Sequence, residues 1–188
     1  MNKTKRRIFD TAMKLFAEKG YSETSVEEIT AVTGIAKGTL YYHFAKKEDI
    51  FYFLTDEGMK LLKNSIELKA YKKETATEKL KEIVLIQIKI IAKYEELITL
   101  ILSQMWGKTE RNVKSQECMR DFIAIIEEVI QEGIQKGEFQ NVDANITATN
   151  IFGIMCTGML YQMNAKEPIN VEITAEKFFT MIMEGIKA

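Results

Sequence analysis

Residues that interrupt helices are scarce in this sequence. Its 188 residues include a single proline, Pro168, and only ten glycines. Proline and glycine disfavour helix interiors, whereas the abundant Lys, Glu, Leu, Ile and Met favour them. We therefore expect an all-α chain of ordinary globular composition, which excludes a disordered or low-complexity class.

Residues for catalysis, metal binding and disulfide formation are also few. The two cysteines, Cys118 and Cys156, lie in separate apolar segments without metal-ligand spacing, so we interpret them as reduced core residues. A single histidine, no glycine-rich phosphate loop and no nucleophile motif leave little from which to build an enzyme. We expect no enzymatic activity, no metal and no cofactor.

The sequence has no apolar run long enough for a membrane span, which needs ~20 residues. Its longest apolar stretch, residues 151–161, contains Gly and Thr, and no apolar signal segment follows the basic residues 1–7. We therefore expect a cytoplasmic protein with no membrane partner.

Charge is nearly balanced over the whole chain, with a net value of −1, but it is unevenly distributed. The first fifty residues carry +2 and the remaining 138 carry −3. Basic residues gather at positions 3–7 and again at Lys46 and Lys47. A protein that touches a polyanion with one end would have this distribution, although charge alone favours an ordinary solvated surface.

Apolar periodicity and capping residues divide the chain into about nine helices. The first ends at Gly20, and Thr24 is expected to cap the second, with Glu27 reaching back in a capping box. The expected helices run from about 8 to 19, 26 to 33, 36 to 43, 47 to 70, 76 to 91, 97 to 106, 119 to 134, 144 to 163 and 171 to 186, with Pro168 in the last turn.

Residues 86–90 alternate between apolar and polar as a strand does, and their β-branched side chains favour that state. A second capping box at Thr75 opens a pattern far longer than a strand, so we predict a helix here. Its apolar residues occupy two faces, which predicts a central position in its domain.

The first three short helices, with a glycine turn at Gly34, have the helix-turn-helix arrangement. In this motif the third helix presents its N-terminal residues to the major groove of duplex DNA. Leu40 and Phe44 are four residues apart and can face the core with Ile35. The side chains expected on the outer surface are those of Lys37, Gly38, Thr39, Tyr42 and His43.

These residues resemble the TetR family signature. The likeness covers residues 8–16, Gly20-Tyr21, Thr24-Ser25-Val26, Ile29, Gly34-Ile35, the run from Lys37 to Phe44, and Lys47-Glu48. It implies base contacts from Lys37, Gly38, Thr39 and Tyr41, and phosphate contacts from Thr24 or Ser25, Tyr42, His43 and Lys47. Ala36 departs from the serine common in the family, so it can neither cap the helix nor donate to a phosphate.

The resemblance also implies two domains, a helix-turn-helix domain at 1–46 and a helical effector-binding and dimerisation domain at 47–188. The last two helices would form a four-helix bundle with their copies in a second subunit, and the dimer would bind a palindromic operator. The residues offered for this contact are Ile151, Ile154, Gly158, Met159, Phe178, Phe179, Ile182 and Ile186, with Gly153 as a place of close approach.

A small-molecule effector would lie between the central helices, and its binding would release the DNA. The aromatic and methionine side chains that could line its pocket are those of Tyr94, Met105, Trp106, Met119, Phe122 and Met155. The lack of charge in this set favours an uncharged or hydrophobic effector, and repression is the commoner outcome in the family.

Two alternatives remain open. In the first, the residues have ordinary structural roles. Methionine and aromatic residues at helical spacing more often form plain core than a pocket, and single lysines or a lone histidine are more often surface residues. An all-helical carrier of a small apolar molecule would explain the Met-rich core, but it would not explain the register of residues 35–47.

Overall fold

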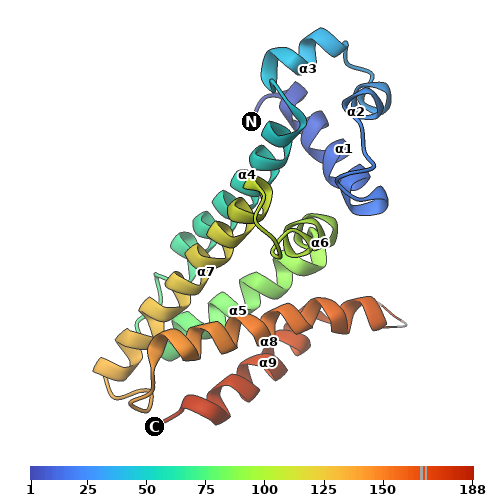
Figure 1. The fold of residues 1–188 in the computed structure, drawn as a ribbon. Helices are drawn as coiled ribbons and strands as arrows, with labels where there is room; N and C mark the ends of the chain where they lie inside the picture. Colours follow the sequence, from blue (N-terminus) through green and yellow to red (C-terminus); the bar gives the residue numbers. More distant parts are fainter. Residues whose placement is uncertain (166, 168) are drawn as a thin grey trace. The chain divides into compact units, whose positions relative to one another are not determined.

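The computed structural model describes residues 1–165, 167 and 169–188, without the side chains of Met159, Gln162 and Met163. In this part of the chain the regular structure is helical, as expected, and a single β-bridge joins Phe139 to Lys187. Pro168, expected in the last turn, lies outside the described residues. The described residues form nine helices (Figure 1): α1 Lys3–Lys19, α2 Val26–Thr33, α3 Lys37–His43, α4 Lys47–Lys69, α5 Ala76–Lys93, α6 Glu95–Ser103, α7 Glu110–Gln135, α8 Ala144–Asn164 and α9 Val171–Ile186.

Packing divides the chain into two compact units. The first contains residues 1–60 and 96–118, and the second contains residues 61–95 and 119–188. Helices α4 and α7 therefore contribute residues to both units. The first unit holds the three predicted DNA-binding helices together with the first half of α4, α6 and the first turns of α7.

Helix α1 forms because its apolar residues recur at helical spacing and its ends are satisfied. The Asn2 side chain caps its first turn by accepting from the Lys5 amide at 2.8 Å. Gly20 ends it with a φ of 88°, a conformation that glycine adopts without steric cost. The buried face of α1 consists of Ile8, Phe9, Ala12, Leu15 and Phe16.

The capping box of α2 lies one residue later than the sequence predicted. Ser25, rather than Thr24, accepts from the backbone amide of Glu28 at 3.1 Å, and the Glu28 carboxylate accepts from the Ser25 amide at 3.2 Å. The prediction was wrong because the Thr24 hydroxyl turns inward and serves the end of α1. The two overlapping motifs, Thr24 with Glu27 and Ser25 with Glu28, cannot be distinguished by spacing alone.

The turn between α2 and α3 has the predicted geometry. Gly34 has a φ of 65°, in the left-handed region, and its amide donates to the Thr30 carbonyl at 2.9 Å. Ala36 precedes α3 and provides no side-chain cap, in agreement with the sequence. Helix α3 is therefore held by its packing rather than by a capping side chain.

Two boundaries between α6 and α7 differ from the predictions. Helix α6 ends at Ser103 rather than Trp106, and α7 begins at Glu110, well before Met119. Thr109 and Asn112 form a reciprocal cap in which the Asn112 side-chain oxygen accepts from the Thr109 amide at 2.9 Å. Asparagine in place of the usual Glu or Gln hides this start from a capping-box search.

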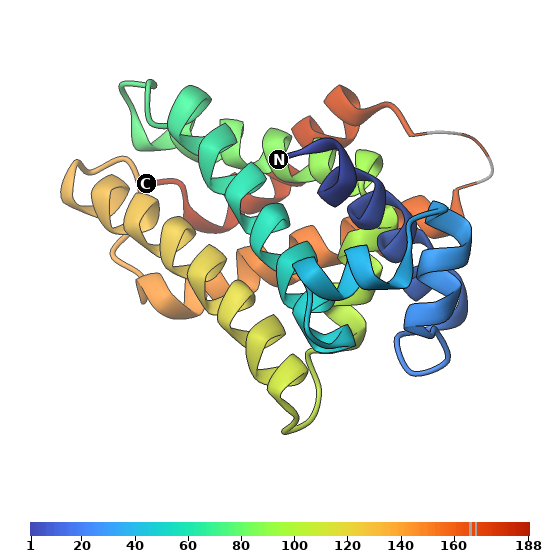
Figure 2. The ribbon, with the colours of Figure 1, turned by 90° about the horizontal axis from the view of Figure 1, so that it is seen from above.

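In the second unit, α5 packs against both α8 and α9, and the three helices run side by side in the two views of Figures 1 and 2. The predicted helix and its central position are thus confirmed, and burial on two faces overrides the strand-like alternation of residues 86–90. The buried residues of α5 are Ala76, Leu80, Ile83, Val84, Ile86, Gln87, Ile88 and Ile91.

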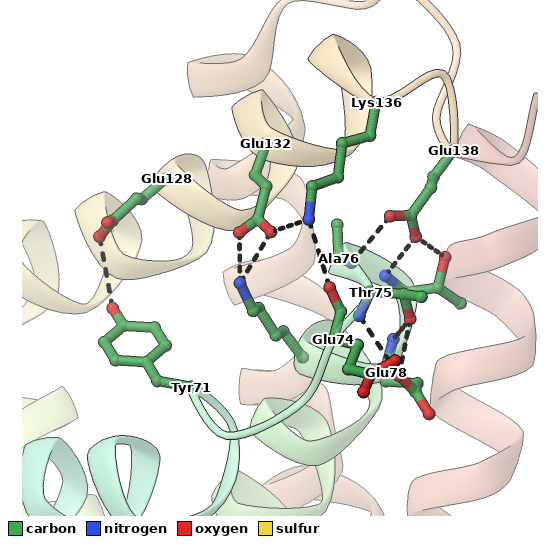
Figure 3. Close-up of polar contacts among 11 residues, drawn as sticks. Tyr71, Glu74, Thr75, Ala76, Glu78, Glu128, Glu132, Lys136 and Glu138 are labelled. Carbon is green, nitrogen blue, oxygen red and sulfur yellow. Dashed lines mark hydrogen bonds and ion pairs between the residues drawn. The ribbon is translucent and has the colours of Figure 1, made fainter.

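The N-terminus of α5 is secured twice (Figure 3). Thr75 and Glu78 form the predicted capping box. In addition, the carboxylate of Glu138, beyond the end of α7, accepts from the amides of Ala76 at 3.0 Å and Thr77 at 2.9 Å. A carboxylate at this position satisfies unpaired amides and complements the helix dipole.

Several residues predicted for a subunit contact lie in the core of their own unit instead. Ile151, Ile182 and Ile186 are at most 6% exposed. A Cβ added at Gly158 would lie 3.1 Å from Ile88 and 3.3 Å from Phe178, so this glycine serves close approach within the unit. Helical spacing identifies an apolar face but cannot say which neighbour covers it. The side chain of Met159 lies outside the described residues.

Candidate nucleic-acid interface

Helix α3 has the predicted division into a buried and an exposed face. Leu40 is fully buried and Phe44, just beyond the helix, is 5% exposed. Tyr42 is 85% exposed and Tyr41 is 42% exposed. The side of α3 that faces solvent also carries Lys37, Gly38 and Thr39, with His43 half-buried at the end of the helix. A helix exposed in this way can enter a major groove.

Side chains from α1 and α4 hold α3 in place. The Arg7 guanidinium donates to the carbonyl of Thr33, the last residue of α2. The Phe44 ring packs on Phe53 of α4 with centroids 5.2 Å apart, and the Lys5 ammonium lies 5.8 Å from the Phe44 ring. These contacts anchor the residues on both sides of α3 to α1 and α4.

The Lys37 ammonium is paired with Glu27, across the turn from α2. The hydrogen bond between the two side chains is the main cause that lowers the pKa of Glu27 and raises the pKa of Lys37. Both side chains are more than half exposed, and exposed ion pairs contribute little free energy. Lys37 can therefore exchange Glu27 for a phosphate or a guanine edge at small cost.

Tyr42 and His43 lie next to each other at the C-terminal end of α3. Their rings meet edge to face with centroids 5.1 Å apart. This arrangement orients two hydrogen-bonding groups on the rim of the exposed face. It suits contacts to the sugar-phosphate strand, which position a protein on the duplex without reading its base sequence.

Of Thr24 and Ser25, only Ser25 can reach a ligand. Thr24 is 1% exposed, and its hydroxyl donates to the carbonyls of Leu15 at 3.1 Å and Gly20 at 2.9 Å. Thr24 therefore links the end of α1 to the start of α2. Ser25 is half-buried, and its hydroxyl oxygen accepts a hydrogen bond while its proton remains available to donate.

The Lys47 ammonium has a different environment from the one expected. It donates to the backbone carbonyls of Tyr21 at 2.9 Å, Ser22 at 3.3 Å and Thr24 at 2.9 Å. An ammonium has three donors, so these carbonyls occupy all of them. Lys47 therefore fixes the α1–α2 loop rather than facing the proposed interface.

Arg7 and Glu27 are the residues of this site that sequence reasoning missed. Arg7 contacts Thr33 and Glu27 contacts Lys37, in each case on another helix. Apolar spacing within one helix cannot predict such contacts. The basic cluster at residues 3–7 was a signal for Arg7, but it indicated a charged surface rather than a structural contact.

The residues predicted for an effector pocket fall in both units. Phe122 and Met155 are buried in the second unit, where Tyr94 and Met119 are half-buried. Met105 and Trp106 belong to the first unit, and Trp106 is 84% exposed. Trp106 therefore does not line an enclosed pocket, because it stands on the short α6–α7 loop rather than on the helix that its apolar neighbours predicted.

No group of three or more His, Cys, Asp or Glu side chains in the described part of the chain is placed to hold a metal ion. Among the helices that the structure describes, none combines the length and the apolar character that crossing a bilayer requires.

Two family models match the chain over most of its length. Residues 8–52 match the model for bacterial regulatory proteins of the tetR family. Residues 73–186 match the model for the tetracyclin repressor-like C-terminal domain. The first match contains most of α1 and all of α2 and α3, and the second contains α5 to α9.

Known proteins resemble the chain along most of its length. The fatty acid metabolism regulator protein of Bacillus subtilis is 32% identical over 149 residues, 78% of this chain and 77% of the relative. The solved structure of FadR from Bacillus subtilis in complex with stearoyl-CoA is 28% identical, with a TM-score of 0.85 over 96% of this chain and 98% of that one. The fatty acid degradation regulator FadR from Bacillus halodurans is 25% identical, with a TM-score of 0.88 over 98% of this chain and 97% of that one. The chain therefore belongs to the TetR family, whose members are helix-turn-helix transcriptional regulators that bind DNA and small-molecule effectors.

Proposed function

We propose that this chain is a dimeric repressor that leaves its operator when it binds a long-chain fatty acyl-CoA. The observation that carries the proposal is the 32% identity with a fatty acid metabolism regulator over 78% of the chain. The likeness to a FadR structure that contains stearoyl-CoA supports the same class of effector.

The proposed DNA contacts come from the exposed face of α3. Lys37, Gly38, Thr39 and Tyr41 would meet base edges, and Tyr42 and His43 would contact the sugar-phosphate strand, with Ser25 at the start of α2. One recognition helix reads only a few base pairs. A palindromic operator with half-sites about 34–36 Å apart, bound by a dimer, supplies the remaining affinity.

The second subunit would pack on the side of α8 and α9 that the first leaves exposed. Large apolar side chains that are at least half exposed lie on these two helices, at Ile146, Leu160, Tyr161, Ile173 and Met181. Gly153 is also exposed, and a Cβ added there would meet open space, so a neighbouring helix can approach. Solvent-exposed apolar groups in such number favour an interface over a bare surface.

The effector would place its acyl chain among apolar side chains of the second unit, with Phe122, Met155, Met119 and Tyr94 as the candidates. The sequence favoured a hydrophobic effector, and an acyl chain meets that expectation. The charged coenzyme portion requires solvent or polar contacts, because a buried unpaired charge is costly. The effector weakens DNA binding only if it prefers the state of the dimer that fits the operator poorly.

The DNA part of the proposal is tested with the region upstream of the chain's own gene. We expect specific binding that weakens steeply as salt rises, because phosphate contacts release counterions. Tyr42→Ala should weaken binding by roughly tenfold, in line with loss of a side chain worth 1–3 kcal/mol. Tyr71→Ala, on a tyrosine of the second unit, is the matched control and should leave binding unchanged.

The effector part is tested by adding stearoyl-CoA, stearate and free coenzyme A separately to the protein–operator complex. Release by stearoyl-CoA alone is the expected result, since both the acyl chain and the coenzyme contribute to binding. Release by coenzyme A alone would overturn the role of the apolar residues. Stearoyl-CoA binding without any affinity for DNA would favour the alternative, a carrier of apolar molecules. A carrier would have no use for the exposed face of α3.

A further inference from the structure

Arg111, in the first turn of α7, lies against the corner of the DNA-binding helices. The centre of its guanidinium is 3.9 Å from the centroid of the Tyr21 ring. Tyr21 follows the end of α1 and is 5% exposed. Arginine stacks on aromatic faces at this distance, so Arg111 is a direct contact between α7 and the helix-turn-helix.

Tyr21 is also the point on which the loop between α1 and α2 is fixed. Its carbonyl accepts from the Lys47 ammonium, which lies 4.4 Å from the centroid of the Tyr21 ring. The ring packs on Phe16 of α1, with centroids 5.0 Å apart, and on Phe51 of α4 at 5.8 Å. Displacing Arg111 would therefore disturb a ring that touches both α1 and α4.

Polar contacts bind the first turns of α7 to the first turns of α4. The Arg111 guanidinium lies 3.7 Å from the Glu48 carboxylate. The Tyr52 hydroxyl donates to Glu110 at 3.1 Å, and the Lys114 ammonium pairs with Asp56. Together these contacts explain why residues 96–118 pack in one unit with the DNA-binding helices.

The α6–α7 loop is fastened to the same turns of α7. The Asn112 amide donates to the Gln104 carbonyl at 2.8 Å, and the Gln116 amide donates to the Met105 carbonyl at 2.9 Å. The Arg111 guanidinium also reaches the Gln104 side chain at 3.4 Å. A displacement of α7 would thus move the loop and Arg111 together.

We propose that Arg111 is a positioning residue for DNA recognition, which couples the state of α7 to the helix-turn-helix through Tyr21. This inference rests on the proposed function and goes beyond it, because it assigns the coupling to a residue of α7. Since α7 continues from the first unit into the second, a change around its later turns can reach Tyr21 without passing along α4. Coupling is reciprocal, so operator binding must in turn steady the first turns of α7.

The reciprocal effect is measured by amide hydrogen exchange of the full-length protein, free and saturated with operator DNA. In the wild type, operator should slow exchange in residues 26–44 and also in residues 104–116, the latter by about fivefold or more. In Arg111→Ala, the protection of residues 26–44 at saturating DNA should remain. That of residues 104–116 should fall below about twofold.

Two further variants complete the experiment. Arg111→Lys retains the charge beside Glu48 but loses the planar stack on Tyr21, so it should also lose the protection of residues 104–116. It keeps the proposal testable if the alanine variant does not fold. Arg120→Ala removes an exposed arginine from the second-unit part of the same helix and should behave as the wild type.

The outcomes separate the two proposals. Wild-type protein that shows no specific affinity for its upstream DNA would overturn the proposed function, and this inference with it. If the wild type binds its operator but residues 104–116 gain no protection, the role of Arg111 is overturned and the proposed function stands. The same holds if these residues remain protected in both Arg111 variants. A purely structural role predicts lower thermal stability with unchanged protection at residues 104–116, which also counts against the proposal.

Discussion

At the scale of single residues, Glu27 is the group that would compete with DNA for Lys37. Its carboxylate holds the Lys37 ammonium, and it stands on the outer surface of α2 beside the recognition helix. We expect Glu27→Gln to raise operator affinity by roughly threefold to tenfold at low salt, because Lys37 is freed and one repulsive charge is removed.

Fluorescence anisotropy of a labelled operator at two salt concentrations measures this effect, which should shrink as salt rises. Glu67→Gln makes the same charge change on an exposed residue of the second unit. An equal gain in both variants would mean that net charge alone is responsible and would contradict the role given to the Lys37–Glu27 pair.

Lys47 provides a second contrast at this scale. Because its ammonium serves three carbonyls of the α1–α2 loop, we expect Lys47→Met to lower the free energy of unfolding by about 1–3 kcal/mol. The salt dependence of operator binding should keep its slope, since no phosphate contact is removed.

Urea unfolding and a salt titration of operator binding test these two expectations on the same variant. Lys46→Met is the control, because Lys46 is exposed and has only a long pair with Glu110 at 3.6 Å. A shallower salt slope with unchanged stability in Lys47→Met would restore the phosphate contact that the sequence predicted.

At the scale of elements, the start of α5 depends on a carboxylate from a distant segment. Burial by itself would raise the pKa of Glu138, but hydrogen bonds from the amides of Thr77 and Ala76 outweigh it, so its pKa lies below the ordinary value. The folded state thus binds this proton more weakly than the unfolded chain does. The stabilisation is present above the unfolded pKa and is lost as pH falls through the lower, folded pKa.

We expect Glu138→Ala to lower the free energy of unfolding by roughly 1 kcal/mol at neutral pH, as for loss of a helix cap. The difference from wild type should shrink as pH falls below about 4. Urea unfolding at several pH values measures it, with Glu128→Ala as control, since Glu128 accepts from the Tyr71 hydroxyl at 3.3 Å and caps no helix. A difference that is constant with pH would contradict the cap.

The connection between α6 and α7 also belongs to this scale. A loop of six residues is fixed by Asn112 and Gln116, whose side chains bind loop carbonyls. Side-chain hydrogen bonds to backbone carbonyls restrict the conformations of the loop. A rigid loop lets the start of α7 act as part of the DNA-binding unit.

At the scale of the whole molecule, the proposed function requires two copies of the chain. The exposed apolar residues of α8 and α9 are the proposed contact, and Leu160 is 56% exposed and Met181 58% exposed. We expect Leu160→Glu with Met181→Glu to yield a folded monomer, since neither side chain is needed in the protomer core and a charge at an apolar interface is costly.

Sedimentation and operator binding test this double variant. We expect a mass of one chain and a loss of affinity for a palindromic site of at least about 100-fold, because each half-site is then bound separately. The matched control is Lys60→Glu with Lys63→Glu, two exposed changes on α4. A dimer that persists in the Leu160 and Met181 variant would place the interface elsewhere.

The sequence by itself determined much of this protein. Apolar spacing and the scarcity of proline determined the helices, because periodicity and propensity are local properties. The residues around Gly34 determined the turn, and those from Lys37 to Phe44 determined which face of α3 is exposed. The resemblance carried by these positions was specific because many residue types had to agree in one register.

The tertiary structure alone decided which partner each polar group has. Thr24 and Lys47 were assigned to DNA by position, yet backbone carbonyls of neighbouring segments occupy them. Trp106 was assigned to a pocket, yet it is exposed on a loop, and Arg111 gave no local signal at all. Contacts across long sequence separations depend on how helices pack, and helical spacing records only that a face is covered, not what covers it.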